Sequence, residues 1–117
     1  MERKSELMER AHLTAKEIYK ISLNFPQKYQ FSIGEQLRRA VLSIPLNITE
    51  GNARISSKEK RQFLNIAFGS VKEVKYLIFF CKEVDLLNEN DYRRLFAIID
   101  NLAKLLYGVL HSFNVSC

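Results

Sequence analysis

The stretch that decides the fold is FLNIAFGSVKEVKYLIFFCKEV, residues 63–84. Its small and apolar positions recur at a 4-3-4-3-4-3 spacing: Phe63, Ala67, Ser70, Val74, Leu77, Cys81 and Val84. This period places all of them on one face of an α-helix of about six turns. We therefore expect a long amphipathic helix whose inner face packs against other helices.

Three further segments show the same period. The first has Leu7, Ala11, Thr14, Ile18, Ile21 and Phe25, and we expect Pro26 to end it. The second, from about Ile33 to about Asn52, has Leu37, Val41, Ile44 and Ile48. The last has Tyr92, Leu95, Ile99, Leu102, Leu106, Val109 and Phe113. Four amphipathic segments with short connections predict a single all-α domain over residues 1–117, an antiparallel up-down-up-down four-helix bundle.

Polar residues before the helical segments predict where the helices begin. Ser32 with Glu35 three positions later has the pattern of a capping box. Ser56 or Ser57 is expected to cap the helix over residues 63–84. Asn88 or Asn90 is expected to cap the last helix.

The segment SIPLNITEGNAR, residues 43–54, admits several interpretations: a turn, a glycosylation sequon, a catalytic motif or a packing element. The helical period on both sides favours a helix that is kinked at Pro45, because proline cannot donate to the Val41 carbonyl. Local tightening of the helix is one way to accommodate the missing bond, and donation to that carbonyl by a neighbouring side chain is another, with Ser43 and Asn47 as the nearest candidates. The segment Met1 to Leu13 has no apolar core of a signal peptide, so we do not expect Asn47 to be glycosylated.

Composition fits a globular chain of 117 residues with 47% hydrophobic and 26% charged residues. We expect no membrane span, and a cytoplasmic location. The two cysteines, Cys81 and Cys117, are then expected to stay reduced, with Cys81 as a buried thiol on an apolar helical face.

The net charge of +5 lies entirely in residues 1–62. The cations of the second helix and of the loop after it are the candidate nucleic-acid contacts: Arg38, Arg39, Arg54, Lys58, Lys60 and Arg61. They would contact phosphates without sequence specificity. A solvated charged loop is the alternative interpretation. Few aromatic residues are near these cations in the sequence, so stacking on bases has little support.

A polar strip runs along the second helix at helical spacing: Gln36, Arg39, Ser43, Asn47, Glu50 and Arg54. A similar strip follows on the third helix: Gln62, Asn65, Gly69, Ser70 and Glu73. We expect Glu50 to pair with Arg54, and Glu73 with Lys72 or Arg39. A solvated face is one interpretation; we favour an assembly or polar-network role for Ser43, Asn47, Glu50, Gly69, Ser70 and Glu73.

Catalysis is not indicated by the sequence. His12 and His111 lie at opposite ends of the chain, and no Glu-x-x-His pair supplies the ligands of a metal site in a bundle. The single glycine of EGNAR does not make a phosphate-binding loop. We expect no cofactor, no metal and no enzyme activity.

The segments QLRRAVLSIPLNITEGNAR and KEKRQFLNIAFGSVKEVKY closely resemble the four-helix bundle family first described from reading frames within intervening sequences of bacterial large-subunit (23S) rRNA genes. The matching residues are Arg38, Arg39, Ser43, Pro45, Asn47, Glu50, Gly51, Arg54, Gly69, Ser70 and Glu73. The resemblance implies a ring-shaped homopentamer without known enzymatic activity. A related branch, the accessory variability proteins of diversity-generating retroelements, binds nucleic acid and a reverse transcriptase through basic surfaces.

The sequence and this resemblance predict a non-enzymatic homo-oligomer, which the resemblance implies to be a pentamer, that binds RNA or other nucleic acid through its basic surface. The alternative is a protein-binding adaptor or scaffold, for example the accessory subunit of a reverse transcriptase.

Overall fold

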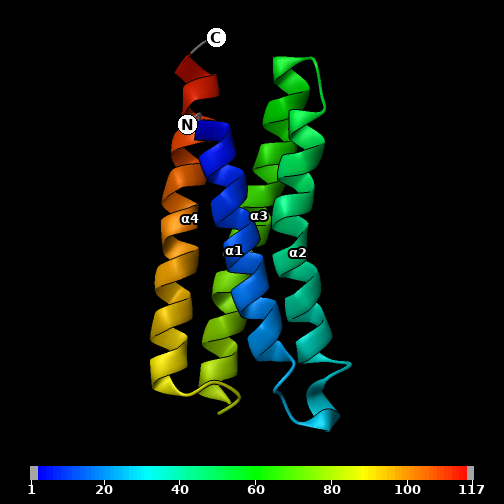
Figure 1. The fold of residues 1–117 in the computed structure, drawn as a ribbon, viewed down its shortest axis with the longest axis vertical. Helices are drawn as coiled ribbons and strands as arrows, with labels where there is room; N and C mark the ends of the chain where they lie inside the picture. The colour runs from blue at the N-terminus through cyan, green and yellow to red at the C-terminus, as the bar shows by residue number, and fades with distance from the viewer. Residues whose placement is uncertain (1–2, 116–117) are drawn as a thin grey trace.

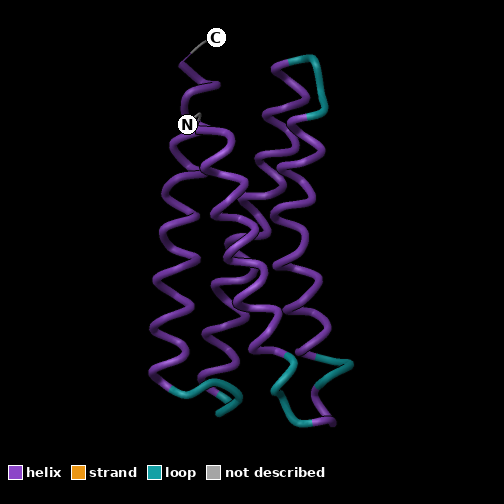
Figure 2. Tube along the Cα trace, viewed as in Figure 1, coloured by secondary structure: helices purple, strands orange, loops and turns teal. Residues whose placement is uncertain are grey.

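The computed structural model describes residues 3–115 as an all-α chain, with helices α1 (Arg3–Ser22), α2 (Ile33–Asn52), α3 (Ser57–Glu83) and α4 (Glu89–Val115). A short 3-10 turn, η1 (Gln27–Tyr29), lies between α1 and α2. No strand occurs in the described range (Figure 2). The prediction of an all-α bundle of four helices is confirmed.

Each helix returns in the direction opposite to the one before it (Figure 1). α2 packs between α1 and α3, and α4 closes the bundle by packing against both α3 and α1. The start of α1, the α2–α3 turn and the end of α4 lie at one end of the molecule (Figure 1). The α1–α2 and α3–α4 connections lie at the other end, and the longest extent of the bundle is 46 Å.

The core consists of the inward faces that the helical period predicts. Fully buried large side chains come from every helix: Leu7, Ile18, Leu37, Ile44, Ile48, Ile78, Leu95, Ile99, Leu102 and Leu106. Cys81 is also buried, as predicted. Two expectations at helix ends were wrong. Val84 is 47% exposed because α3 has ended there, and Phe25 is buried in the α1–α2 connection rather than on α1, which ends at Ser22.

Two of the expected helix caps are present. The Ser56 hydroxyl accepts a hydrogen bond from the Glu59 amide at 3.2 Å, and Asn88 Oδ1 accepts one from the Asp91 amide at 2.7 Å. Ser32 occupies the position before α2, but the predicted capping box does not form. Its backbone (φ −123°, ψ −102°) turns the side chain back, so the hydroxyl donates to the Tyr29 carbonyl at 3.4 Å.

α2 is assigned as one continuous helix through Pro45, and the kink itself stays a prediction. Of the two ways in which Pro45 was expected to be accommodated, side-chain donation to the Val41 carbonyl does not occur among residues 3–115. Asn47 Nδ2 instead donates to the Ser43 carbonyl at 2.8 Å, because a polar side chain on a helix reaches the carbonyl four residues earlier. Thr49 Oγ1 donates in the same manner to the Pro45 carbonyl at 2.8 Å.

By length and composition, the α4 segment Glu89–Phe113 could span a membrane, with a mean hydropathy of 1.2. The segment thus has the length and composition of a span, but this alone does not contradict the expectation of no membrane span, which stays a prediction. The structure nevertheless accounts for the apolarity, because Leu95, Ile99, Leu102 and Leu106 of α4 are fully buried in the bundle. A core helix of a soluble protein passes the same test, so α4 is weak evidence for a membrane.

Candidate nucleic-acid interface and polar network

A basic cluster lies at the α2–α3 turn and consists of Arg54, Lys58, Lys60 and Arg61, with Glu59 as the only carboxylate between residues 54 and 61. Arg54 pairs with Glu50 as expected, with 3.4 Å between Nη2 and Oε2. Its guanidinium also lies 4.8 Å from the centroid of the Phe63 ring. The side chain is thereby held against the start of α3 while its charge remains at the surface.

Arg38 and Arg39 do not join this cluster. Arg39 and Arg54 are fifteen positions apart, which corresponds to about 22 Å along a helix. Arg39 is 82% exposed and lies 3.7 Å from the Glu35 carboxylate. The six candidate cations therefore form two groups. Arg38 and Arg39 lie in the first half of α2, and the other four lie at the α2–α3 turn and the start of α3.

The Arg38 guanidinium binds the α1–α2 connection. It donates to the Ser22 hydroxyl at 3.1 Å, to Gln30 Oε1 at 3.2 Å and to the Gln30 carbonyl at 2.6 Å. Gln30 Nε2 in turn donates to the Phe25 carbonyl at 2.7 Å. Charge-assisted hydrogen bonds of this kind fix the returning chain against α2, so Arg38 has a structural role that leaves few donors for phosphate.

Three of the predicted network residues meet between α2 and α3. The Ser43 and Ser70 hydroxyl oxygens are 2.8 Å apart, and Asn47 Nδ2 donates to Ser43 Oγ at 3.0 Å as well as to the Ser43 carbonyl. Ser70 is only 8% exposed, so this bond satisfies a polar group inside the helix interface. The polar strip therefore holds two helices of one chain together at this point.

The other three residues of the predicted network do not join that hydrogen-bonded group. Glu50 is exposed and contacts only Arg54 among the described ion pairs. Glu73 is exposed, and the ion pair expected with Lys72 or Arg39 does not form among residues 3–115; Arg39 pairs with Glu35, and Lys72 Nζ lies over the Phe68 ring. Gly69 faces open space, with nothing within 4 Å of an added Cβ.

An exposed apolar seam on α3 was missed in the sequence. Ile66, Tyr76, Phe80 and Val84 are all at least 40% exposed, and the rings of Tyr76 and Phe80 are 6.3 Å apart. Ile66, Gly69, Glu73, Tyr76 and Phe80 follow a 3-4-3-4 spacing and form a second face of α3, and Val84 lies just past the end of that helix. The helical period of this second face is present in the sequence, but the inward face of α3 has more apolar residues and was the one predicted.

The titratable groups offer little for catalysis. Burial raises the pKa of the Cys81 thiol to about 11, so it stays protonated. Hydrogen bonds from Lys75 (2.8 Å) and Lys104 lower the pKa of Asp100 and tie it between α3 and α4. No group of three or more His, Cys, Asp or Glu side chains that could hold a metal ion occurs among the described residues.

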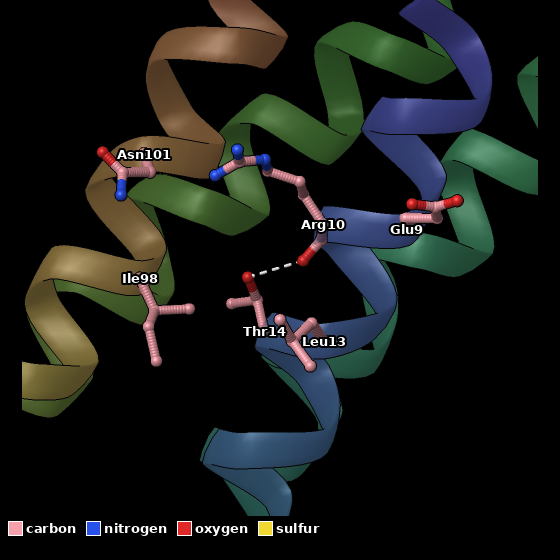
Figure 3. Close-up of a pocket in the computed structure, with 6 residues that line it drawn as sticks. All are labelled: Glu9, Arg10, Leu13, Thr14, Ile98 and Asn101. Atoms are coloured by element: carbon pink, nitrogen blue, oxygen red, sulfur yellow. Dashed lines mark hydrogen bonds between the residues drawn. The ribbon is translucent and has the colours of Figure 1, made fainter. Parts of the chain in front are cut away.

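A surface hollow of about 370 Å³ lies between α1 and α4 (Figure 3). Leu13 and Ile98 line it together with Glu9, Arg10 and Asn101. In Figure 3 the Arg10 side chain extends toward the helix that carries Asn101, whereas Glu9 lies on the other side of α1. The Thr14 hydroxyl donates a hydrogen bond within α1, to the Arg10 carbonyl at 2.7 Å. The hollow thus presents no paired acid and base.

A comparison with curated proteins found no match. Among solved structures, a protein of unknown function from the S23 ribosomal protein family of Bacteroides thetaiotaomicron VPI-5482 is similar, with a TM-score of 0.85. The two share 21% sequence identity over 94% of this chain and 99% of that one, so this likeness shows the fold alone. The family model of the 23S rRNA-intervening sequence proteins matches residues 3–108, and the chain belongs to that family.

Proposed function

We propose that this protein is a non-enzymatic homo-oligomer, a pentamer as the family resemblance implies, that binds RNA or other nucleic acid in the cytoplasm. The observation that carries the nucleic-acid part is the basic cluster Arg54, Lys58, Lys60 and Arg61 at one end of the bundle. Lys58 and Arg61 are exposed, and neither forms an ion pair within residues 3–115. Cations without internal partners can neutralise phosphates without first losing a bond inside the protein.

A salt titration of RNA binding tests this proposal. If the four cations of the cluster each contact a phosphate of a single strand, the logarithm of the affinity falls with the logarithm of salt concentration with a slope of about −3 per subunit. The variant Lys58→Gln/Lys60→Gln removes two of these charges and is expected to make the slope shallower. The matched control Lys16→Gln/Lys20→Gln removes two exposed charges from α1 and should leave it unchanged. Absence of affinity even at low ionic strength contradicts the proposal.

The exposed apolar seam of α3 supports the homo-oligomer. Three exposed apolar side chains on one unpartnered face of α3, with Gly69 among them and Val84 just past the helix end, suit close packing against a second helix. Light scattering of the wild-type protein after size exclusion gives the subunit number. A monomer at every concentration contradicts self-assembly.

Gly69→Ala separates assembly from folding. Within one bundle the added methyl group meets nothing, and alanine is about 1 kcal/mol more favourable than glycine inside a helix. A monomer should therefore melt at the same or a higher temperature, while an interface that closes over Gly69 should dissociate more readily. Glu50→Ala tests the polar strip in the same assay; unchanged size and melting would refute its assembly role.

The alternative function, a protein-binding adaptor such as the accessory subunit of a reverse transcriptase, is favoured by Ile55. This side chain is 98% exposed at the tip of the α2–α3 turn, beside Arg54. An apolar side chain beside a cation is a suitable anchor for a protein partner. A reverse-transcriptase gene beside this one favours the adaptor, and an enclosing rRNA gene favours RNA binding. If the variant Ile55→Asp no longer binds a purified protein partner but keeps its affinity for RNA, the adaptor function is established.

A further inference from the structure

A second hollow lies between α3 and α4, at the same end of the bundle as the basic cluster. It has a volume of about 160 Å³ and is lined by Arg61, Asn65, Phe68, Tyr107, Leu110 and His111. The α3 residues follow the 4-3 spacing of one helical face, and Tyr107 and His111 are one turn apart on α4. The two helices thus bring together residues that are distant in sequence.

The walls of this hollow are aromatic. The ring centroids of Phe68 and Tyr107 are 6.1 Å apart, and Tyr107 and His111 are also 6.1 Å apart with an interplanar angle of 15°. Tyr107 remains 60% exposed, so most of its surface is still available to a partner. A row of rings beside a hollow is a stacking platform for another planar group, and every nucleobase has such a face.

The polar groups of the hollow suit a nucleotide as well. The Asn65 amide both donates and accepts, as the edges of bases do, and the Arg61 guanidinium matches the geometry of a phosphate. Neither side chain has a hydrogen bond or ion pair within the described part of the chain. Both sets of donors are therefore free for a ligand.

The electrostatics favour an anion. None of the six lining residues is acidic, and Lys72 Nζ lies 5.2 Å above the Phe68 ring. The hollow between α1 and α4, in contrast, is lined by Glu9. Arg61 also belongs to the basic cluster, so the hollow continues directly into the surface to which we assign phosphate binding.

The size of the hollow restricts the ligand. Sites for whole small molecules usually measure about 300–1,000 Å³, and this one is smaller. It suits one planar ring system whose attached backbone stays outside. A base stacked inside a duplex cannot enter, whereas an unpaired base can.

From these observations we infer that the α3–α4 hollow is a site for one unpaired base of a single-stranded nucleic acid. Tyr107 stacks on the base, Phe68, whose ring is tilted by 46° to that of Tyr107, packs against the rim of the base, Asn65 contacts its polar edge, and Arg61 binds the adjoining phosphate. This inference rests on the proposed nucleic-acid function and adds that the protein prefers single strands to duplexes.

The test compares single-stranded RNA and DNA oligonucleotides that carry one 2-aminopurine with duplexes of the same sequence. Tyr107→Ala is expected to weaken single-strand binding about 5- to 150-fold, the range of one lost base stack, and to leave duplex binding within twofold. Tyr107→Phe keeps the ring and should bind like the wild type. The emission of 2-aminopurine should change on binding to the wild-type protein and to Tyr107→Phe, but less on binding to Tyr107→Ala. The RNA and DNA arms show whether the sugar matters.

Each outcome separates the two proposals. If Lys58→Gln/Lys60→Gln weakens binding but Tyr107→Ala does not, the base site is refuted and the phosphate surface stands. Equal losses for single strands and duplexes in Tyr107→Ala also refute the base site. If the wild type binds no oligonucleotide at low salt, the nucleic-acid function itself fails. Because Tyr107 is exposed, circular dichroism should show Tyr107→Ala to be folded, and Asn65→Ala, with an expected single-strand-specific loss, provides an independent variant.

Discussion

Two neighbouring arginines of α2 provide a controlled comparison of structural and surface roles. Arg38 donates three hydrogen bonds to Ser22 and Gln30, whereas Arg39 makes one exposed contact with Glu35. Replacing either by alanine removes the same charge from adjacent positions of one helix. We expect Arg38→Ala to destabilise the bundle strongly and Arg39→Ala to leave its stability almost unchanged.

The magnitudes follow from the geometry. Hydrogen bonds to charged groups contribute about 1.5–3 kcal/mol each, and the 2.6 Å bond to the Gln30 carbonyl is the best formed of the three. Allowing for partial exposure, Arg38→Ala should lower the free energy of unfolding by about 2–4 kcal/mol. The exposed pair of Arg39 should contribute about 0–0.5 kcal/mol.

Urea unfolding followed by circular dichroism measures the difference. With a denaturant dependence of about 2 kcal/mol/M, Arg38→Ala should lower the midpoint by about 1–2 M. All variants are compared at one protein concentration, because assembly makes stability depend on concentration. Arg38→Lys keeps the charge but loses the planar fork, so it should fall between the two. Equal midpoints for Arg38→Ala and Arg39→Ala would refute the structural role of Arg38.

Three further predictions concern other contacts of the bundle. Ser70→Ala removes the 2.8 Å bond to Ser43 and should lower the free energy of unfolding by about 1 kcal/mol in urea; no change would show that the bond is not stabilising. In a Cys117→Ser background, Cys81 should react with a thiol reagent at pH 8 only after unfolding, since burial raises its pKa to about 11; rapid native labelling would contradict this. The pKa of Asp100 is lowered in the folded state, so its contribution to stability is present above its unfolded pKa of about 4 and is lost as pH falls through the lower folded pKa. Asp100→Asn should therefore reduce the fall in melting temperature at acid pH. A fall equal to that of the wild type would disprove the assignment.

Local sequence patterns were sufficient to predict most of the fold. The 3.6-residue period predicted the four helices, and the polar caps before α3 and α4 predicted where those two helices begin, because both signals act within a few residues. Val84 and Phe25 were misplaced because period alone does not show where a helix stops. The family was also recognisable, since its motif residues lie close together in α2 and α3.

The candidate site was less predictable because it depends on contacts between distant segments. From the sequence alone, Arg38 was interpreted as a surface cation. In the structure the α1–α2 connection folds back against α2, and Gln30 supplies acceptors for the Arg38 guanidinium. The expectation that few aromatics lie near the basic residues was wrong for a similar reason. It counted neighbours along the sequence, whereas α4 brings Tyr107 and His111 beside Arg61 in space. The local signals were the one-turn spacing of Tyr107 and His111 on α4 and the 4-3 spacing of Arg61, Asn65 and Phe68 on α3.

The grouping of the start of α1, the end of α4 and the α2–α3 turn at one end of the bundle affects how the protein should be handled in the laboratory (Figure 1). A purification tag or dye attached through either helix would stand at the same end of the bundle as the basic cluster, and a polyhistidine or acidic tag there would complicate a test of the proposed nucleic-acid binding. Phe31, 80% exposed in the α1–α2 connection at the opposite end, is a better attachment point. A fluorophore at that position would lie at the opposite end of the bundle from the basic cluster, and so would suit a test of the proposed nucleic-acid binding.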